Sequence, residues 1–297
     1  MDRAEAEVAK SDPIYDALLY IFVPIQFILL GIFLYHLNDP LLTTGDIIGR
    51  ITGMGMLCGV TGINLAHELG HRSKSIEIFM SKSLLLTSLY MHFYIEHNRG
   101  HHKHVSTYED PASSRLNEAL YLFWYRSITT GYKSAWSLEI NRLRALNKSI
   151  FSFKNEMVQF TILQGLSIVS VYILFGAVPT IGFIFAALFG IILLETVNYI
   201  EHYGLQRKKN TSGRYEVTTP VHSWNSNHVV GRLFLFELSR HSDHHFKANR
   251  KYQILRHHDH SPQLPTGYPG MMLLSLIPPL WFSIMNKRID RIKNYEL

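Results

Sequence analysis

The sequence has little cysteine and little charge. Cys58 is the single cysteine among 297 residues, which excludes an internal disulfide and any metal or iron–sulfur site that needs several thiolates. Charged residues make up 18% of the chain and hydrophobic residues 47%, which is a low charge content for a soluble globular protein. Residues 1–12 also lack the basic start and short apolar core of a cleavable signal peptide. The composition therefore favours a membrane protein whose chemistry does not depend on thiolates.

Four hydrophobic segments are long enough to cross a bilayer, and they form two hairpins. We predict transmembrane helices at about 14–37, 47–66, 157–175 and 180–200. The turn that joins the two helices of each hairpin contains no lysine or arginine. Basic residues instead follow the other helix ends, so the positive-inside rule places those ends in the cytoplasm. The predicted fold is an all-α integral membrane protein with at least four spans and a cytoplasmic, histidine-rich helical cap.

The remaining chain is predicted to form this cap. It comprises residues 67–155 and 201–297, and together with the spans it makes a single membrane-embedded domain over residues 1–297. Residues 203–236 read as a polar loop. The apolar run at 271–285 is interrupted by two adjacent prolines, so we expect a bent or interfacial helix there.

Histidines are abundant, and nine of the 17 fall into clusters at the cytoplasmic ends of the predicted helices. Within a cluster the spacing is three, four or five residues, which places side chains on the same or adjoining faces of a helix. Neutral imidazole is a common ligand of transition metals. Nine ligands are too many for one metal and suit two metals with four or five imidazoles each. The candidate metal ligands are His67, His71, His97, His101, His102, His202, His241, His244 and His245.

The ligand type restricts the metal. Calcium and magnesium prefer oxygen ligands, whereas imidazole suits zinc, copper, iron and nickel. The spacing of the histidines cannot separate these four. Iron is favoured by the setting, because a membrane-apposed site with an apolar approach suits oxygen chemistry on a hydrocarbon.

Acidic residues lie within or beside each histidine cluster. Ligating histidines need acceptors that fix the orientation and tautomer of each ring. Capping or ordinary surface charge is the alternative role for the same carboxylates. The candidates for ring orientation are Glu68, Glu96, Glu201 and Asp243, with Asp110, Asn198 and Asp259 as weaker ones.

Two other functions fit part of the pattern. His67-Glu68-x-x-His71 matches the HExxH motif of zinc proteases, in which Glu68 would be the general base. That interpretation leaves the other histidine clusters unexplained. A metal carrier would place ionisable ligands along a path through the membrane, whereas these clusters gather on one side.

Four motifs resemble those of the membrane-bound alkane 1-monooxygenases, which belong with the membrane fatty acid desaturases and xylene monooxygenases. Two further blocks, SWNSNH and LPTGYPG, extend the resemblance beyond ordinary desaturases. The four motifs are HELGH at 67–71, EHNRGHH at 96–102, NYIEHYG at 198–204 and RHSDHH at 240–245.

The resemblance implies a non-haem di-iron site held by the nine histidines, with no catalytic residue beyond these ligands. It implies hydroxylation of the terminal carbon of medium or long n-alkanes to primary alcohols. Dioxygen would be the oxidant, and rubredoxin with an NAD(P)H-dependent reductase would supply electrons. The alkane would enter from the lipid of a bacterial inner membrane, and nucleic acid is not an expected partner. Desaturation or hydroxylation of a methyl-aromatic compound is the related alternative. Members of this family usually carry a further hydrophobic hairpin ahead of the point where this chain begins, and we expect this sequence to lack it.

Overall fold

The computed structural model describes residues 3–295, and within that range the chain is helical without a β-strand. Two pairs of residues form isolated bridges, Lys209 with Tyr215 and Asn225 with Gln263. The α-helices are α1 (Arg3–Ser11), α2 (Pro13–His36), α3 (Thr44–Leu57), α4 (Leu65–Gly70), α5 (Ser75–Thr87), α6 (Phe93–Glu96), α7 (His102–His104), α8 (Leu120–Ala145), α9 (Glu156–Phe175), α10 (Ala177–His202), α11 (Val229–Phe234), α12 (His241–Phe246), α13 (Tyr268–Ser275) and α14 (Pro278–Tyr295). The π-helices are η1 (Cys58–Asn64) and η2 (His97–His101), and the 3-10 helices are η3 (Pro220–His222) and η4 (Tyr252–Ile254).

Residue contacts divide the chain into two compact units. Unit 1 comprises Met1–Lys10, Arg99–Gly131 and Glu195–Leu297, and unit 2 comprises Ser11–Asn98 and Tyr132–Leu194. Both units are assembled from separate stretches of the chain. The single domain expected over 1–297 stays a prediction.

Three helices within the described residues are long and apolar enough to cross a membrane, namely α2, α9 and α10. They coincide with three of the four predicted spans, within a few residues at each end. The fourth predicted span, 47–66, is helical but is divided among α3, η1 and α4. It stays a prediction, as does the cytoplasmic side of the cap.

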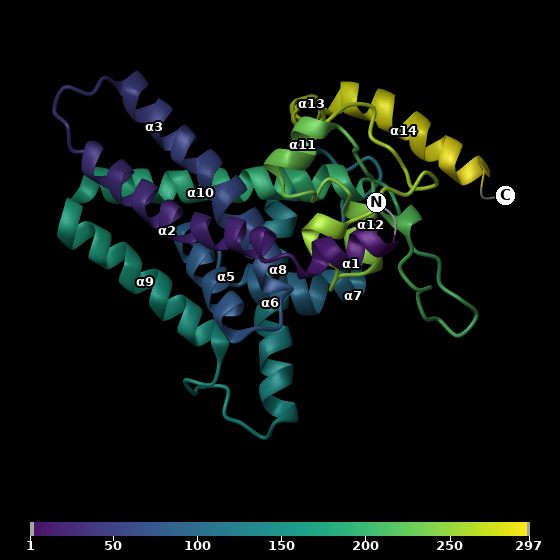
Figure 1. The fold of residues 1–297 in the computed structure, drawn as a ribbon, viewed down its shortest axis with the longest axis horizontal. Coiled ribbons are helices and arrows are strands. Elements are labelled where there is room, and N and C mark those ends of the chain that lie inside the picture. The colour runs from purple at the N-terminus through teal and green to yellow at the C-terminus, as the bar shows by residue number, and fades with distance from the viewer. Residues whose placement is uncertain (1–2, 296–297) are drawn as a thin grey trace. The chain divides into compact units, whose positions relative to one another are not determined.

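Unit 2 is built around the contact of α2 with α3 and the first part of α10 (Figure 1). Phe33 of α2 and Leu37, which directly follows α2, share one buried cluster with Cys58 and Phe183. The backbones of α10 and η1 approach closely at Gly190, where an added Cβ would lie 2.7 Å from the Cβ of Cys58. Small residues permit this kind of helix contact in a membrane protein. The packing fixes the helical segment that ends at the HELGH motif.

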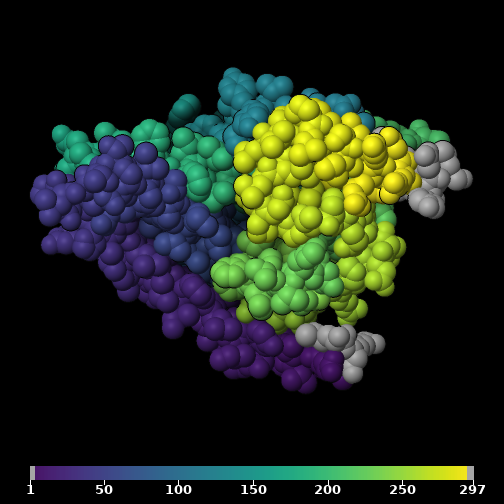
Figure 2. Space-filling view, turned by 90° about the horizontal axis from the view of Figure 1, so that it is seen from above, coloured from purple at the N-terminus to yellow at the C-terminus, as the bar shows by residue number. Residues whose placement is uncertain are grey.

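Unit 1 has an aromatic core that joins the end of α10 to the C-terminal helices. Trp281 of α14 lies 5.2 Å from Tyr199 and 5.3 Å from Tyr203, measured between ring centroids. Trp224 donates a hydrogen bond from Nε1 to the carbonyl oxygen of Tyr203 at 2.9 Å. Figure 2 shows the C-terminal helices in yellow, beside the green segment that precedes them in unit 1. This core fixes the end of α10, where a candidate metal ligand lies.

Two predictions for the C-terminal half have clear outcomes. The bend expected at 271–285 is confirmed, because α13 ends at Ser275 and α14 begins at Pro278. The polar loop expected at 203–236 is wrong in part, because α11 and η3 interrupt it. A helix of six residues is too short to give a periodic hydrophobic pattern.

Candidate metal centre

Four histidines of unit 1 bring their ring nitrogens to one place. They come from the end of η2, the end of α10 and two positions one turn apart on α12, and all four are buried. The Nε2 atom of His245 lies 3.1 Å from that of His101 and 2.9 Å from that of His241. The Nε2 atom of His241 lies 3.1 Å from that of His202. The histidine quartet is His101, His202, His241 and His245, whose ligand atoms all lie within 4.8 Å of one another.

The donor set of this quartet fits a metal ion. A neutral imidazole has one N–H and one lone pair, and two of these Nε2 atoms each face two others. One proton on each ring cannot satisfy all these close contacts, whereas an ion that accepts the lone pairs can. Burial, reinforced by the neighbouring histidines, holds the pKa of His245 well below its usual range, so its ring stays neutral. Separations near 3 Å also suit nitrogens that each lie about 2.0–2.1 Å from one ion.

Three histidines of unit 2 form a second cluster. The Nε2 atom of His71 lies 3.3 Å from that of His67 and 3.1 Å from that of His97. His67 and His71 are one helical turn apart, and the ring of His97 stacks on Phe93 with centroids 4.8 Å apart. The histidine triad, as we name these three residues, presents several imidazole nitrogens to one point and can contribute ligands to a metal.

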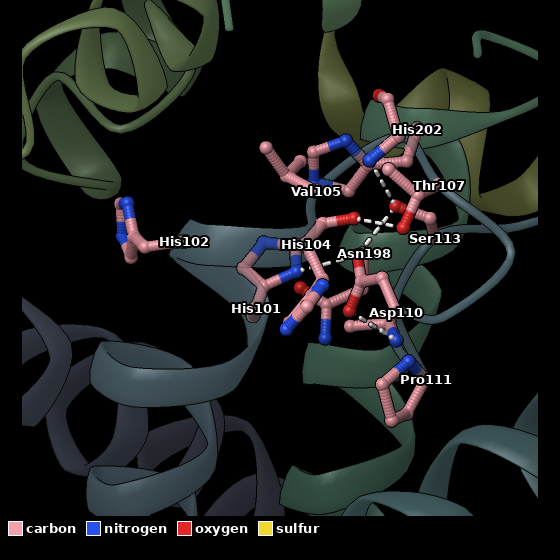
Figure 3. Close-up of polar contacts among 12 residues, drawn as sticks. His101, His102, His104, Val105, Thr107, Asp110, Pro111, Ser113, Asn198 and His202 are labelled. Atoms are coloured by element: carbon pink, nitrogen blue, oxygen red, sulfur yellow. Dashed lines mark hydrogen bonds and ion pairs between the residues drawn. The ribbon is translucent and has the colours of Figure 1, made fainter. Parts of the chain in front are cut away.

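The remaining two candidates form a pair within unit 1. The Nε2 atoms of His102 and His244 lie 3.1 Å apart. His102 and His244 therefore lie in a different cluster from their sequence neighbours, because His101 and His245 belong to the quartet. Figure 3 shows the ring of His102 apart from the group that His101 forms with Asp110. The structure thus divides two of the sequence motifs between different clusters.

Comparison with known proteins gives the family. The family model described as fatty acid desaturase matches residues 47–275. The chain is 41% identical over 285 residues to alkane 1-monooxygenase of Acinetobacter baylyi, which covers 96% of this chain and 70% of that protein. It is 44% identical over 250 residues to alkane 1-monooxygenase 2 of Alcanivorax borkumensis, covering 84% and 65%. The chain belongs to the alkane 1-monooxygenase group of the fatty acid desaturase family. It spans about two thirds of the length of these two relatives. The xylene/toluene monooxygenase hydroxylase component of Pseudomonas putida is 26% identical over 291 residues, which cover 94% of this chain and 75% of that protein.

In this member of the family, Asp110 orients a ring of the quartet. Its Oδ2 lies 2.8 Å from His101 Nδ1 and accepts a hydrogen bond from Ser113 Oγ at 2.5 Å (Figure 3). Burial alone would raise the pKa of Asp110, but His101 and Ser113 outweigh it and hold the pKa below its usual range. Sequence spacing supports Asp110 only weakly, because Asp110 lies nine residues beyond His101.

Glu201, one of the four main carboxylate candidates, contacts the quartet directly. Its Oε2 lies 3.2 Å from His241 Nε2, the nitrogen that faces the other rings. Its Oε1 accepts a hydrogen bond from the hydroxyl of Tyr268 at 2.6 Å. Burial, reinforced by this carboxylate, raises the pKa of Tyr268 well above its usual range. The tyrosine of LPTGYPG therefore keeps its proton and holds Glu201 in place.

The other carboxylate candidates have different surroundings. Asp243 is fully buried and accepts hydrogen bonds from Arg250, from His258 Nε2 at 2.7 Å and from the Arg256 amide at 2.9 Å. Glu96 directly precedes His97 in the sequence and is buried. Of the weaker candidates, Asn198 donates to Glu195 at 3.3 Å, and Asp259 is exposed, with Oδ1 3.4 Å from His257 Nε2.

Glu68 forms an ion pair in this family member. Arg72 contacts Glu68 at 2.6 Å and Asp16 at 3.1 Å, and these side chains are largely buried. A general base must be positioned to accept a proton from the reacting group. A carboxylate that neutralises a buried guanidinium is poorly suited to that role. The local geometry therefore weakens the zinc-protease interpretation of HELGH.

Proposed function

We propose that this protein hydroxylates the terminal carbon of medium- or long-chain n-alkanes to primary alcohols with dioxygen. The observation that carries the proposal is the convergence of four buried imidazoles in a chain 41% to 44% identical to alkane 1-monooxygenases. The three apolar helices support access to a substrate dissolved in lipid, where alkanes partition spontaneously.

Two non-haem iron ions held by the nine candidate histidines are the proposed cofactor, and the quartet would hold one of them. Bound iron would supply the activation of dioxygen. The residues of the chain would hold the ligands in place: Asp110 orients the ring of His101, and burial keeps His245 neutral and its lone pair available. The buried setting would also keep water from the reacting carbon.

Rubredoxin, reduced by an NAD(P)H-dependent reductase, is the proposed electron donor. The formal net charge of +6 supports an acidic partner. The proposed location is a bacterial inner membrane with the histidine clusters on the cytoplasmic side. The basic residues that follow the predicted spans, among them Arg72 and Arg207, support that orientation.

Hydroxylation of a methyl-aromatic compound is the second candidate. The 26% identity with the xylene/toluene monooxygenase component supports it. The alkane assignment is preferred because identity with the alkane enzymes is higher over a similar length of chain. Both reactions insert oxygen into a methyl C–H bond, so the choice depends on the shape of the substrate.

The direct test supplies n-octane, NADH, rubredoxin, its reductase and ¹⁸O₂ to membranes that contain the full chain. We expect 1-octanol labelled with one ¹⁸O atom and two iron ions per purified chain. His245→Ala should remove the product and lower the iron content. His104→Ala is the control, because His104 lies two residues beyond the candidate ligand His102 but pairs with Glu109 at 3.2 Å. Unlabelled alcohol, an alkene product or a bound zinc in place of iron would contradict the proposal.

A further inference from the structure

α11 of unit 1 exposes large apolar side chains. Val229, Val230, Leu233 and Phe234 have exposed fractions between 62% and 70%, although α11 has only six residues. Single exposed apolar residues are ordinary on a protein surface, but a contiguous group of large ones marks an interaction site. The group therefore needs a covering partner.

The exposed position of α11 is fixed by its surroundings. Arg232, the one charged residue of the helix, forms two hydrogen bonds with Glu237, at 2.7 and 2.9 Å. The chain then turns through Phe236 and Glu237, which have φ values of 50° and 60°. Residues other than glycine rarely adopt this left-handed conformation and occupy it at a cost. This defined turn therefore holds the apolar helix α11 at the surface.

The turn between α13 and α14 continues the apolar surface. Leu273, Ile277 and Leu280 are 67%, 54% and 45% exposed. The two regions meet at their helix starts, where a Cβ added to Gly267 would lie 3.5 Å from the side chain of His228. Figure 2 also shows the green segment beside the yellow C-terminal helices. We define the apolar patch as Val229, Val230, Leu233, Phe234, Leu273, Leu276, Ile277 and Leu280.

The charge pattern around the patch indicates lipid as its partner. Residues 268–286 contain no charged side chain, and Lys287, Arg288 and Arg291 follow directly on α14. Apolar residues next to basic ones suit the boundary between acyl chains and anionic headgroups.

The core of unit 1 connects the patch-bearing helices to the end of a helix that can cross a membrane. Trp281 of α14 packs against Tyr199 and Tyr203 at the end of α10, and α10 is long and apolar enough to cross a membrane. The hydroxyl of Tyr121 also donates to the Leu276 carbonyl oxygen at 2.7 Å, which places an aromatic residue of α8 beside the turn. Aromatic residues are enriched at the membrane interface.

We propose that the apolar patch inserts into one leaflet of the bilayer, with Lys287 and Arg291 at the level of anionic headgroups. Unit 1 then has a membrane contact of its own, besides the spanning helices. This contact does not depend on the reaction, so it can be tested whether or not the protein oxidises alkanes.

The test uses cysteine labelling of the full chain in vesicles of phosphatidylcholine and phosphatidylglycerol. The native Cys58 is fully buried, so a reagent labels an introduced surface cysteine selectively. Val230→Cys and Leu273→Cys would each carry an environment-sensitive fluorophore. Val217→Cys is the control, because Val217 is 81% exposed in the same unit but lies outside the patch. We expect acyl-chain spin labels to quench the fluorophore at 230 and 273, and aqueous iodide to quench it at 217.

The remaining outcomes separate the alternatives. Quenching by iodide at 230 and 273, as strong as at 217, would overturn the proposal. Protection from both quenchers would show that protein covers the patch, such as a second copy of the chain, and would overturn it as well. In a second arm, acyl-chain quenching at 230 should increase with phosphatidylglycerol content. Lys287→Gln combined with Arg291→Gln should abolish that increase, and an unchanged increase would overturn the assigned role of the basic residues.

Discussion

The histidine quartet of unit 1 and the histidine triad of unit 2 use the same ligand type but are supported differently. In the quartet, the ring of His101 is held from behind by the buried carboxylate of Asp110, 2.8 Å away. In the triad, the ring of His97 stacks on Phe93 with 4.8 Å between centroids. A charged hydrogen bond fixes the ring direction more strictly than a stacked contact does.

The two clusters also differ in how far apart their residues lie in the sequence. The triad joins residues 67 and 97, whereas the quartet joins His101 to His245 across 144 positions. Bringing distant segments together restricts more of the chain, and the conformational entropy that is lost must be offset by local interactions. Beside the quartet, the buried carboxylate of Asp110 contacts both His101 and Ser113, whereas beside the triad Glu68 pairs with the guanidinium of Arg72.

Removing that guanidinium should have the largest effect on unit 2. Arg72→Met leaves Glu68 and Asp16 without the cation that contacts both. Breaking a buried ion pair by removing one partner costs about 3–5 kcal/mol. We expect a loss of this size in thermal or denaturant unfolding in detergent. Lys74→Met is the control, because Lys74 is exposed nearby, and an equal loss in both variants would show that the network contributes nothing specific.

Acid should weaken unit 2 through His92. Burial lowers the pKa of His92 to about 4, whereas an exposed histidine has a pKa near 6.5. Below pH 6.5 the unfolded chain binds a proton that the folded chain resists, so this stability is present above pH 6.5 and is lost as the pH falls towards 4. The loss reaches about 3 kcal/mol at the low end. His92→Gln should make the free energy of unfolding fall less steeply over this pH range. Equal slopes of unfolding free energy against pH in the variant and the parent protein would refute the assignment.

Asp110→Asn tests the support of the quartet. The amide cannot act as a charged acceptor for His101 Nδ1, and loss of such a partner lowers metal affinity or activity by about 10- to 100-fold. Competition with a chelator, followed by metal analysis, measures this directly. Glu109→Gln is a close control, because Glu109 pairs with His104 at 3.2 Å, outside the clusters. If Phe93→Leu in the triad weakens metal retention as much as Asp110→Asn, the proposed difference between the units is wrong.

Hydropathy predicts the long helices, and spacing picks out the nine histidines as candidate ligands, because hydropathy and spacing both report local pattern. The spans at 14–37 and 157–175 match α2 and α9 closely. The span at 47–66 shows the limit, because the change to a π-helix at Cys58–Asn64 leaves hydropathy unchanged. π-Segments are frequent at functional sites, and this one directly precedes the helix that carries His67.

The division of the histidines could not be predicted from spacing. His101 and His102 are adjacent, yet one approaches His245 and the other His244. These contacts depend on how α12 docks in unit 1, which is a matter of long-range packing. Spacing also underestimates Asp110. The chain reverses between His101 and Asp110 through Ser106, which has a φ of 56°, and no sequence rule predicts where such a reversal points a carboxylate.

Tyr268→Phe should have the smallest effect of the four changes. The variant keeps the aromatic packing but removes the hydroxyl that donates to Glu201. A buried acceptor that loses its donor costs about 1–3 kcal/mol, so unfolding in detergent should shift by that amount. Because Glu201 Oε2 contacts His241 Nε2, the electronic spectrum of cobalt bound in place of iron should change as well. Tyr125→Phe is the control, since Tyr125 is 75% exposed. A shift in stability without a spectral change would show that Tyr268 supports the fold of unit 1 but not the geometry of the quartet.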